Sequence, residues 1–262
     1  MTSHSETATD PTRPVLIACA HGTREPAGQQ VVLDLVVAIR DRLGVEVRVA
    51  YVDVQDPKVD KVVAELRARD VDSGPTEVDG KNADPTDDVG ENAGPTAVVV
   101  PLLLAGGYHV YVDIAEAVED RDDVVAAPAL GPDERLIGIV LERVRDVGVP
   151  ESATLVLAAA GSSDPRSQTD TEAAADMLRA RWGGPVRIGY AAGMKPTVAE
   201  AVAAARANGP EVVVAVASFL LSPGFFQGRI ETAGANYFTG PLAPHPLLLD
   251  IIADRYRESG GA

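Results

Sequence analysis

The sequence predicts an α/β protein made of two similar doubly wound domains, each a four-stranded parallel sheet flanked by helices. Short, continuous apolar runs alternate with stretches of helical periodicity, the pattern of parallel strands joined by crossover helices. The chain has 262 residues, enough for two domains. Its second half also repeats landmarks of the first at a constant offset, which favours two related domains over one large sheet.

The first half supplies a full set of strands and helices. Continuous apolar or β-branched runs predict the strands, while proline at a helix start and glycine at a helix end mark the helices. In chain order, strands are expected at 14–20, 45–52, 97–104 and 124–127, with helices opened by Pro26 and Pro57 and spanning 110–119 and 132–147.

The second half is predicted to be a degenerate copy of the first. Its apolar run Leu155–Ala160 matches the first strand. Four pairs of residues keep an offset of 139: Gly22 and Gly161, Pro26 and Pro165, Tyr51 and Tyr190, Pro57 and Pro196. The boundary is expected near residues 148–152, giving domains at 14–148 and 152–258.

Two segments do not fit either copy. Residues 70–96 contain eight acidic residues and one basic residue among glycine, proline and asparagine, which predicts a flexible acidic insert. Residues 1–13 are polar, without the apolar stretch of a signal peptide, and are expected to be a disordered tail.

Composition excludes several classes of protein. The net charge of −16 argues against a nucleic-acid or anionic-membrane partner. No apolar run approaches the roughly 20 residues that cross a bilayer. The single cysteine, Cys19, excludes an intramolecular disulfide and fits a reducing compartment. A cytoplasmic protein is therefore expected.

Three polar side chains follow the first three strands of the first half. His21, Asp53 and His109 each lie at or just beyond a strand's carboxyl end, where open parallel sheets bind their ligands. Two imidazoles and a carboxylate suit Fe²⁺, Co²⁺, Ni²⁺ or Zn²⁺, and the same groups could move protons near neutral pH. The second half has Ala160, Ala192 and Phe225 at the matching positions. One half is thus expected to hold the site, and the other to support it or bind substrate.

Other reactive groups are weaker candidates. Ser162 and Ser163 lack the Gly-x-Ser-x-Gly context of a nucleophile elbow. Cys19 is expected to be a small core residue. Gly106 and Gly107 lack the spacing of a dinucleotide-binding loop.

Three motifs together resemble the sirohydrochlorin chelatase family, the cobalt, iron or nickel chelatases of tetrapyrrole biosynthesis. They are Ala20-His21-Gly22-Thr23-Arg24, Ala50-Tyr51-Val52-Asp53 with Asp56-Pro57, and the stretch from Val100 to Val110 (VPLLLAGGYHV) with Asp113-Ile114. The resemblance implies an ATP-independent class II chelatase of siroheme or cobalamin biosynthesis. It also implies that the two doubly wound α/β domains are chelatase-like, with the active site between them.

The resemblance also implies roles for single residues. His21 and His109 correspond to the family's metal-site histidines, and Asp53 stands where the family usually has glutamate. No organic cofactor is implied, because the divalent metal is itself a substrate. Insertion into sirohydrochlorin expels two pyrrole N–H protons, so a loosely held metal beside a base is required.

Substrate binding is expected to use both halves. Sirohydrochlorin carries eight carboxylates, and basic side chains at Arg24, Lys195 and Arg229 could bind them, with Gly106 and Gly107 contributing from the third motif. As an internal pseudo-dimer, the chain is expected to be a monomer. Two alternatives remain: a non-catalytic metal or tetrapyrrole carrier, and a histidine-phosphatase-like enzyme. The latter needs arginine directly before the histidine, where this chain has Ala20.

Overall fold

Strands and helices alternate along the whole chain in the computed structural model, which describes residues 9–72, 94–207, 209 and 211–261. The first half contains β1 (Val15–Ala20), α1 (Pro26–Leu43), β2 (Val47–Tyr51), α2 (Val59–Asp72), β3 (Ala97–Pro101), η1 (His109–Ile114), α3 (Ala115–Val118), β4 (Val124–Ala126) and α4 (Glu134–Asp146). The second half contains β5 (Thr154–Ala159), α5 (Pro165–Arg179), β6 (Val186–Tyr190), α6 (Val198–Arg206), β7 (Val214–Phe219), α7 (Phe225–Glu231), β8 (Tyr237–Phe238) and α8 (Pro246–Glu258). All the strands and helices expected in the first half are present, but η1 is a π-helix where an α-helix was predicted.

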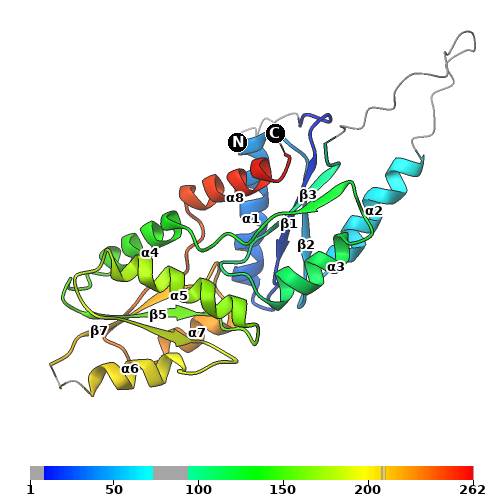
Figure 1. Cartoon of the computed structure of the whole chain (residues 1–262). Helices are drawn as coiled ribbons and strands as arrows, with labels where there is room; N and C mark the ends of the chain where they lie inside the picture. Colours follow the sequence, from blue (N-terminus) through cyan, green and yellow to red (C-terminus); the bar gives the residue numbers. More distant parts are fainter. Residues whose placement is uncertain (1–8, 73–93, 208, 210, 262) are drawn as a thin grey trace, which may run out of the picture.

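Two four-stranded parallel sheets form the centres of two lobes (Figure 1). Their strand orders are β2-β1-β3-β4 and β6-β5-β7-β8, so each copy places its first strand between its second and third. Gly22 and Gly161, the glycines that follow β1 and β5, share a left-handed φ of 90°. The predicted fold class and the internal repeat are confirmed.

The central strand β1 is covered on both faces. Its side chains alternate between two cores: Leu16 and Ala18 pack with α1, whereas Ile17 and Cys19 pack with α2. These four residues have no exposed surface. Burial raises the pKa of the Cys19 thiol to about 12, and the nearby Asp113 carboxylate adds to the effect. Cys19 is therefore a core residue, as predicted.

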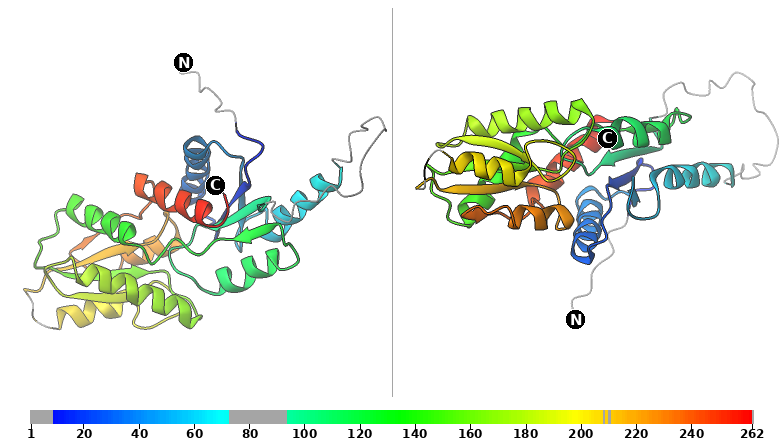
Figure 2. Two further views of the ribbon diagram at one scale, coloured as in Figure 1. Left: turned by 45° about the horizontal axis from the view of Figure 1, so that its top comes forward. Right: turned by 90° about the horizontal axis from the view of Figure 1, so that it is seen from below.

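The last helix of each half packs on the other lobe. Helix α8 contacts α1 and β3 of the first lobe, while α4 contacts α5 and β7 of the second. Figure 1 and the left view of Figure 2 show α8 lying against α1, with α4 beside α5. The predicted division into 14–148 and 152–258 therefore matches the two sheets but not the packing of these two helices. Helical periodicity shows that a helix has an apolar face, but it does not show which of the two sheets this face packs against.

The segments predicted to lack order are described only in part. The Arg13 guanidinium donates hydrogen bonds to the carbonyl oxygens of Leu43 and Gly261, so residues 9–13 belong to the folded surface, contrary to the prediction. Residues 1–8 lie outside the described chain. Most of the predicted insert, residues 73–93, also lies outside it, while residues 70–72 continue α2. A search of the described helices finds none with the length and apolar character of a membrane span.

Candidate functional site

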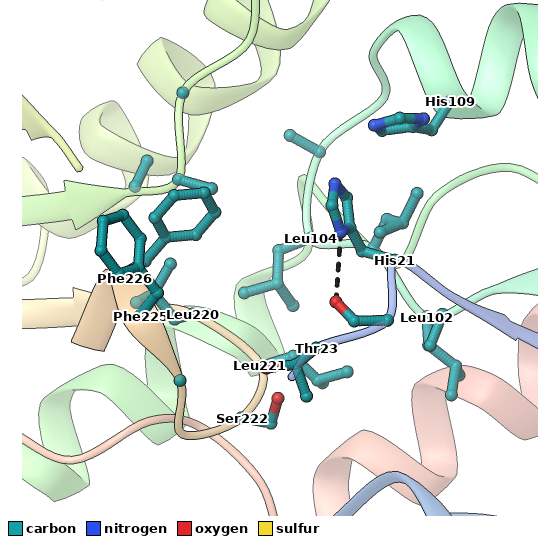
Figure 3. A pocket seen from close by; sticks show the side chains of 18 of the residues that line it. His21, Thr23, Leu102, Leu104, His109, Leu220, Leu221, Ser222, Phe225 and Phe226 are labelled. Atoms are coloured by element: carbon teal, nitrogen blue, oxygen red, sulfur yellow. Dashed lines mark hydrogen bonds between the residues drawn. The ribbon is translucent and has the colours of Figure 1, made fainter. Parts of the chain in front are cut away.

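A cavity of about 610 Å³ lies between the lobes, at the carboxyl ends of the central strands. Both copies contribute to its lining, through residues 20–25, 102–105 and 107–109 of the first lobe and residues 159–162 and 219–227 of the second. This is the edge at which open parallel sheets bind ligands, and the volume suits a sizeable organic molecule. Figure 3 shows the two histidines facing the aromatic pair Phe225 and Phe226.

The turn after β1 presents His21 to the cavity. Gly22 has a φ of 90°, which favours glycine, and a Cβ there would lie 3.0 Å from the backbone nitrogen of Gln55. The Thr23 N–H donates to Gln55 Oε1 at 2.9 Å, tying this turn to the loop after β2. His21 Nδ1 lies 3.2 Å from the Gly22 carbonyl oxygen. Because a carbonyl can only accept, Nδ1 carries the hydrogen and Nε2 keeps its lone pair.

The π-helix η1 begins at His109, and its first turn contains the partner of this histidine. Asp113 Oδ2 lies 2.6 Å from His109 Nδ1. A carboxylate on Nδ1 fixes the ring's orientation and leaves Nε2 as a metal-binding lone pair. In the sequence, Asp113 stands out only as part of the third motif. An acid four residues after a histidine on a helix is the signal that could have identified it.

The two imidazoles lie next to each other beyond the carboxyl ends of β1 and β3. Their ring centroids are 4.7 Å apart and their planes are nearly perpendicular, at 88°. His109 retains 33% of its side-chain exposure, so the pair is accessible from the cavity. Within the described ranges, no cluster of three or more His, Cys, Asp or Glu side chains has the arrangement of a metal site. An ion held by this pair keeps open coordination positions, which suits a metal that is passed on to a substrate.

Asp53, the third predicted member of the site, does not join the histidines. Its backbone N–H donates to the His21 carbonyl oxygen at 3.2 Å, but its side chain is exposed and does not line the cavity. β2 ends at Tyr51, and the chain has already turned away from the sheet edge at Asp53. A catalytic role for Asp53 stays a prediction that this geometry does not support.

The predicted basic residues are dispersed. Arg24 lines the cavity and is the one permanently charged base among its described lining residues. Arg229 borders an adjoining hollow; its guanidinium donates to the Ala191 carbonyl oxygen at 2.7 Å and lies over the Phe225 ring. Lys195 is 73% exposed, forms an ion pair with Glu200 and does not line the cavity. Lys195 thus lies in a surface turn, where its role in substrate binding stays a prediction.

The remaining candidates also separate. Gly107 lines the cavity, whereas the Gly106 N–H donates to Asp170 of the other lobe. Ser162 lines the cavity, but its Oγ accepts a hydrogen bond from the Asp164 backbone N–H and has no general base beside it. The structure gives no support to a serine nucleophile.

The wall opposite the histidines is apolar, and no sequence motif marks it as a binding surface. Leu220, Leu221, Phe225 and Phe226 line it from the second lobe. Phe225 stands where the first copy has His109 and is 66% exposed. The duplicated fold therefore provides the two histidines on one wall and an apolar surface on the other.

This geometry defines the protein as a two-lobed α/β protein with paired histidines in a cleft between the lobes. Comparison with known proteins gives its family. The CbiX family model matches residues 15–73, 84–147 and 154–259, and the chain belongs to the CbiX family.

Individual relatives have names that describe chelatases. The chain is 28% identical over 142 residues to a sirohydrochlorin ferrochelatase of Priestia megaterium, a match covering 51% of this chain and 53% of the relative. It is 23% identical over 131 residues to a sirohydrochlorin cobaltochelatase of Sulfolobus acidocaldarius, covering 49% and 87%. The chain thus spans about half the length of the Priestia protein. The solved structure of SirB from Bacillus subtilis with Fe³⁺ superposes with a TM-score of 0.72 at 20% identity, over 95% of this chain and 96% of that one, which establishes the shared fold.

Proposed function

We propose that this protein is a sirohydrochlorin chelatase, a lyase that inserts Fe²⁺ or Co²⁺ into sirohydrochlorin in siroheme or cobalamin biosynthesis. The observation that carries the proposal is the His21–His109 pair, 4.7 Å apart in a cavity large enough for an organic substrate. Membership of the CbiX family and the names of the relatives support the same activity.

The chemistry follows from the tautomers of the two histidines. Both Nδ1 atoms face acceptors, so both Nε2 atoms can bind the divalent metal that is to be inserted. When four macrocycle nitrogens replace these ligands, two pyrrole protons leave and the charge balances. Each imidazole becomes free as the metal departs and can accept a proton. The chain works as a monomer without an organic cofactor in this scheme.

Metal insertion measured by absorbance tests the proposal. Sirohydrochlorin is mixed anaerobically with Fe²⁺, Co²⁺ or Ni²⁺, with and without protein. We expect acceleration by the wild type and a loss of at least about 100-fold for His21→Ala or His109→Ala. Full activity of both variants would contradict the site. A carrier would bind metal or sirohydrochlorin without speeding insertion, which separates that alternative.

Recognition of the substrate's carboxylates is a further part of the proposal. The apolar wall would face the macrocycle, while Arg24 would bind an acidic side chain at the cavity's edge. We expect Arg24→Ala to raise the KM for sirohydrochlorin about 5- to 10-fold, as for the loss of one charge-assisted hydrogen bond. Lys195→Ala, a surface change of the same type, is the matched control and should leave the KM unchanged. An equal rise in both variants would favour the wider basic surface predicted from the sequence.

A further inference from the structure

Helix α5 of the second lobe holds the segment that carries His109. The Gly106 N–H donates to Asp170 Oδ2 at 2.7 Å. One turn earlier on α5, the Arg166 guanidinium lies 3.6 Å from the centre of the Tyr111 ring. Gly106 precedes His109 and Tyr111 follows it, so these two contacts bracket the histidine from the opposite lobe.

Packing between the bracketing contacts is close. A Cβ on Gly106 would lie 2.6 Å from the Tyr111 hydroxyl, so a side chain there would displace the ring from Arg166. A Cβ on Gly107 would lie 3.2 Å from Ser162 Oγ and 3.5 Å from Ser167 Cβ. The two glycines therefore permit a close approach of the lobes.

The same glycines leave the backbone before His109 without intrinsic stiffness, because glycine has the largest conformational freedom of any residue. Asp113 fixes the ring of His109 but does not fix the backbone on which the residue stands. A metal-binding pair must be held to within about 0.5 Å. An external acceptor for the Gly106 N–H meets this requirement.

We propose that α5 forms a cross-lobe clamp in which Asp170 and Arg166 are positioning residues that hold His109 opposite His21. Asp170 makes the stronger contact, a charge-assisted hydrogen bond. Arg166 is kept over Tyr111 by its bond to Asp164 Oδ2 at 2.7 Å. The clamp rests on the proposed function, and it gives the copy without histidines a part in the metal site.

Variants of Asp170 test the clamp. Asp170→Ala removes the acceptor, and we expect Co²⁺ affinity and kcat to fall about 10-fold, as for other outer partners of metal ligands, with the KM for sirohydrochlorin unchanged. Asp170→Asn keeps an acceptor oxygen and should restore most of both. Arg166→Ala should cost about threefold, the effect of one exposed cation–π contact. Asp176→Ala, which removes a surface partner of Arg179 on the same helix, is the matched control.

Two measurements on the metal-free protein test the clamp without any assay of metal insertion. Asp170→Ala should speed amide hydrogen exchange at Gly106 at least 10-fold and shift the NMR signals of the His109 ring, whereas Asp170→Asn and Asp176→Ala should do neither. Unchanged exchange and unchanged His109 signals in Asp170→Ala would overturn the clamp. Failure of the wild type to insert metal would overturn the proposed function instead, and these two readouts would still decide whether α5 positions His109.

Discussion

The contact between His109 and Asp113 decides what the histidine pair can do. At 2.6 Å between Nδ1 and Oδ2, it is a short hydrogen bond to a charged acceptor. Such a partner fixes the tautomer, increases the electron density on the opposite ring nitrogen and prevents ring rotation. His21 has a weaker partner, the Gly22 carbonyl oxygen at 3.2 Å. His109 is therefore the more firmly oriented of the two histidines.

Removal of this carboxylate should weaken metal binding. We expect Asp113→Ala to lower Co²⁺ affinity 10- to 100-fold, the usual cost of losing the carboxylate behind a histidine ligand. Titration with Co²⁺, followed by its visible absorption, measures the change. Asp53→Ala is the matched control, because this carboxylate is exposed and outside the cavity, and it should change affinity less than twofold. A larger loss in Asp53→Ala than in Asp113→Ala would restore the assignment made from the sequence.

The histidines could be predicted from sequence, but their surroundings could not. His21 and His109 follow adjacent parallel strands, and topology alone brings such positions together. The spacing of four residues makes Asp113 a candidate partner of His109, but only the structure shows that its side chain turns toward Nδ1. Lys195 lies outside the cavity in an ion pair with Glu200, which alignment of the two copies does not reveal.

Helix α1 contacts the second lobe through a glycine that helix propensity alone would disfavour. A Cβ on Gly28 would overlap the carbonyl oxygen of Pro223 in the loop before α7. In α4, Gly138 has the opposite surroundings, since the nearest atom to its Cβ position is Leu247 Cδ1 at 3.9 Å. The two helical glycines therefore differ in what a methyl group would contact.

Alanine at the two positions should have opposite effects on stability. Gly138→Ala gains helix propensity and should raise the free energy of unfolding by about 0.5–1 kcal/mol. Gly28→Ala should lower it by about 1–3 kcal/mol, because overlap with a backbone oxygen outweighs the same gain. Urea denaturation measures both. Equal stabilisation by the two substitutions would show that α1 and the Pro223 loop separate at little cost.

Elements were predicted well where one local signal dominates. The apolar run of β1 and the Pro26 and Gly44 that bound α1 are such signals. The π-helix η1 was not predicted, since its apolar residues Val110 and Ile114 also fit α-helical spacing. The exchange of α4 and α8 between lobes was missed because it depends on tertiary packing.

At the scale of the whole molecule, duplication followed by divergence explains the site. Both lobes keep the same strand order, yet one supplies the histidine pair and the other an apolar wall and α5. Helices α4 and α8, each of which packs on the other lobe, contact each other at a cluster of charged side chains. Arg135 of α4 donates to Asp254 of α8 at 2.5 Å, and Arg255 donates to the Leu130 carbonyl oxygen. Asp133, which caps α4, accepts two hydrogen bonds from the Arg135 guanidinium.

This cluster should make stability depend on acid pH. Burial alone would raise the pKa of Asp133, but the hydrogen bonds from Arg135 outweigh it and hold the pKa below its usual value of 3.8. The folded state therefore binds fewer protons than the unfolded state, so the carboxylate stabilises the fold above about pH 4, and this contribution is lost as pH falls through the lowered pKa. Asp133→Asn keeps a good helix cap and removes the charge.

Urea unfolding between pH 3 and 6 measures this linkage. We expect wild type and Asp133→Asn to differ most at pH 6 and to converge at the acid end, because protonation then removes the same charge from the wild type. Asp41→Asn, an exposed substitution on α1, is the control. The difference in free energy of unfolding between the wild type and this variant should not shrink as the pH falls. Because α4 and α8 each pack on the other lobe, the two lobes should unfold in a single transition. The pH dependence should therefore appear in the midpoint of that one transition. Parallel pH profiles for wild type and Asp133→Asn would show that the charge cluster does not hold the lobes together.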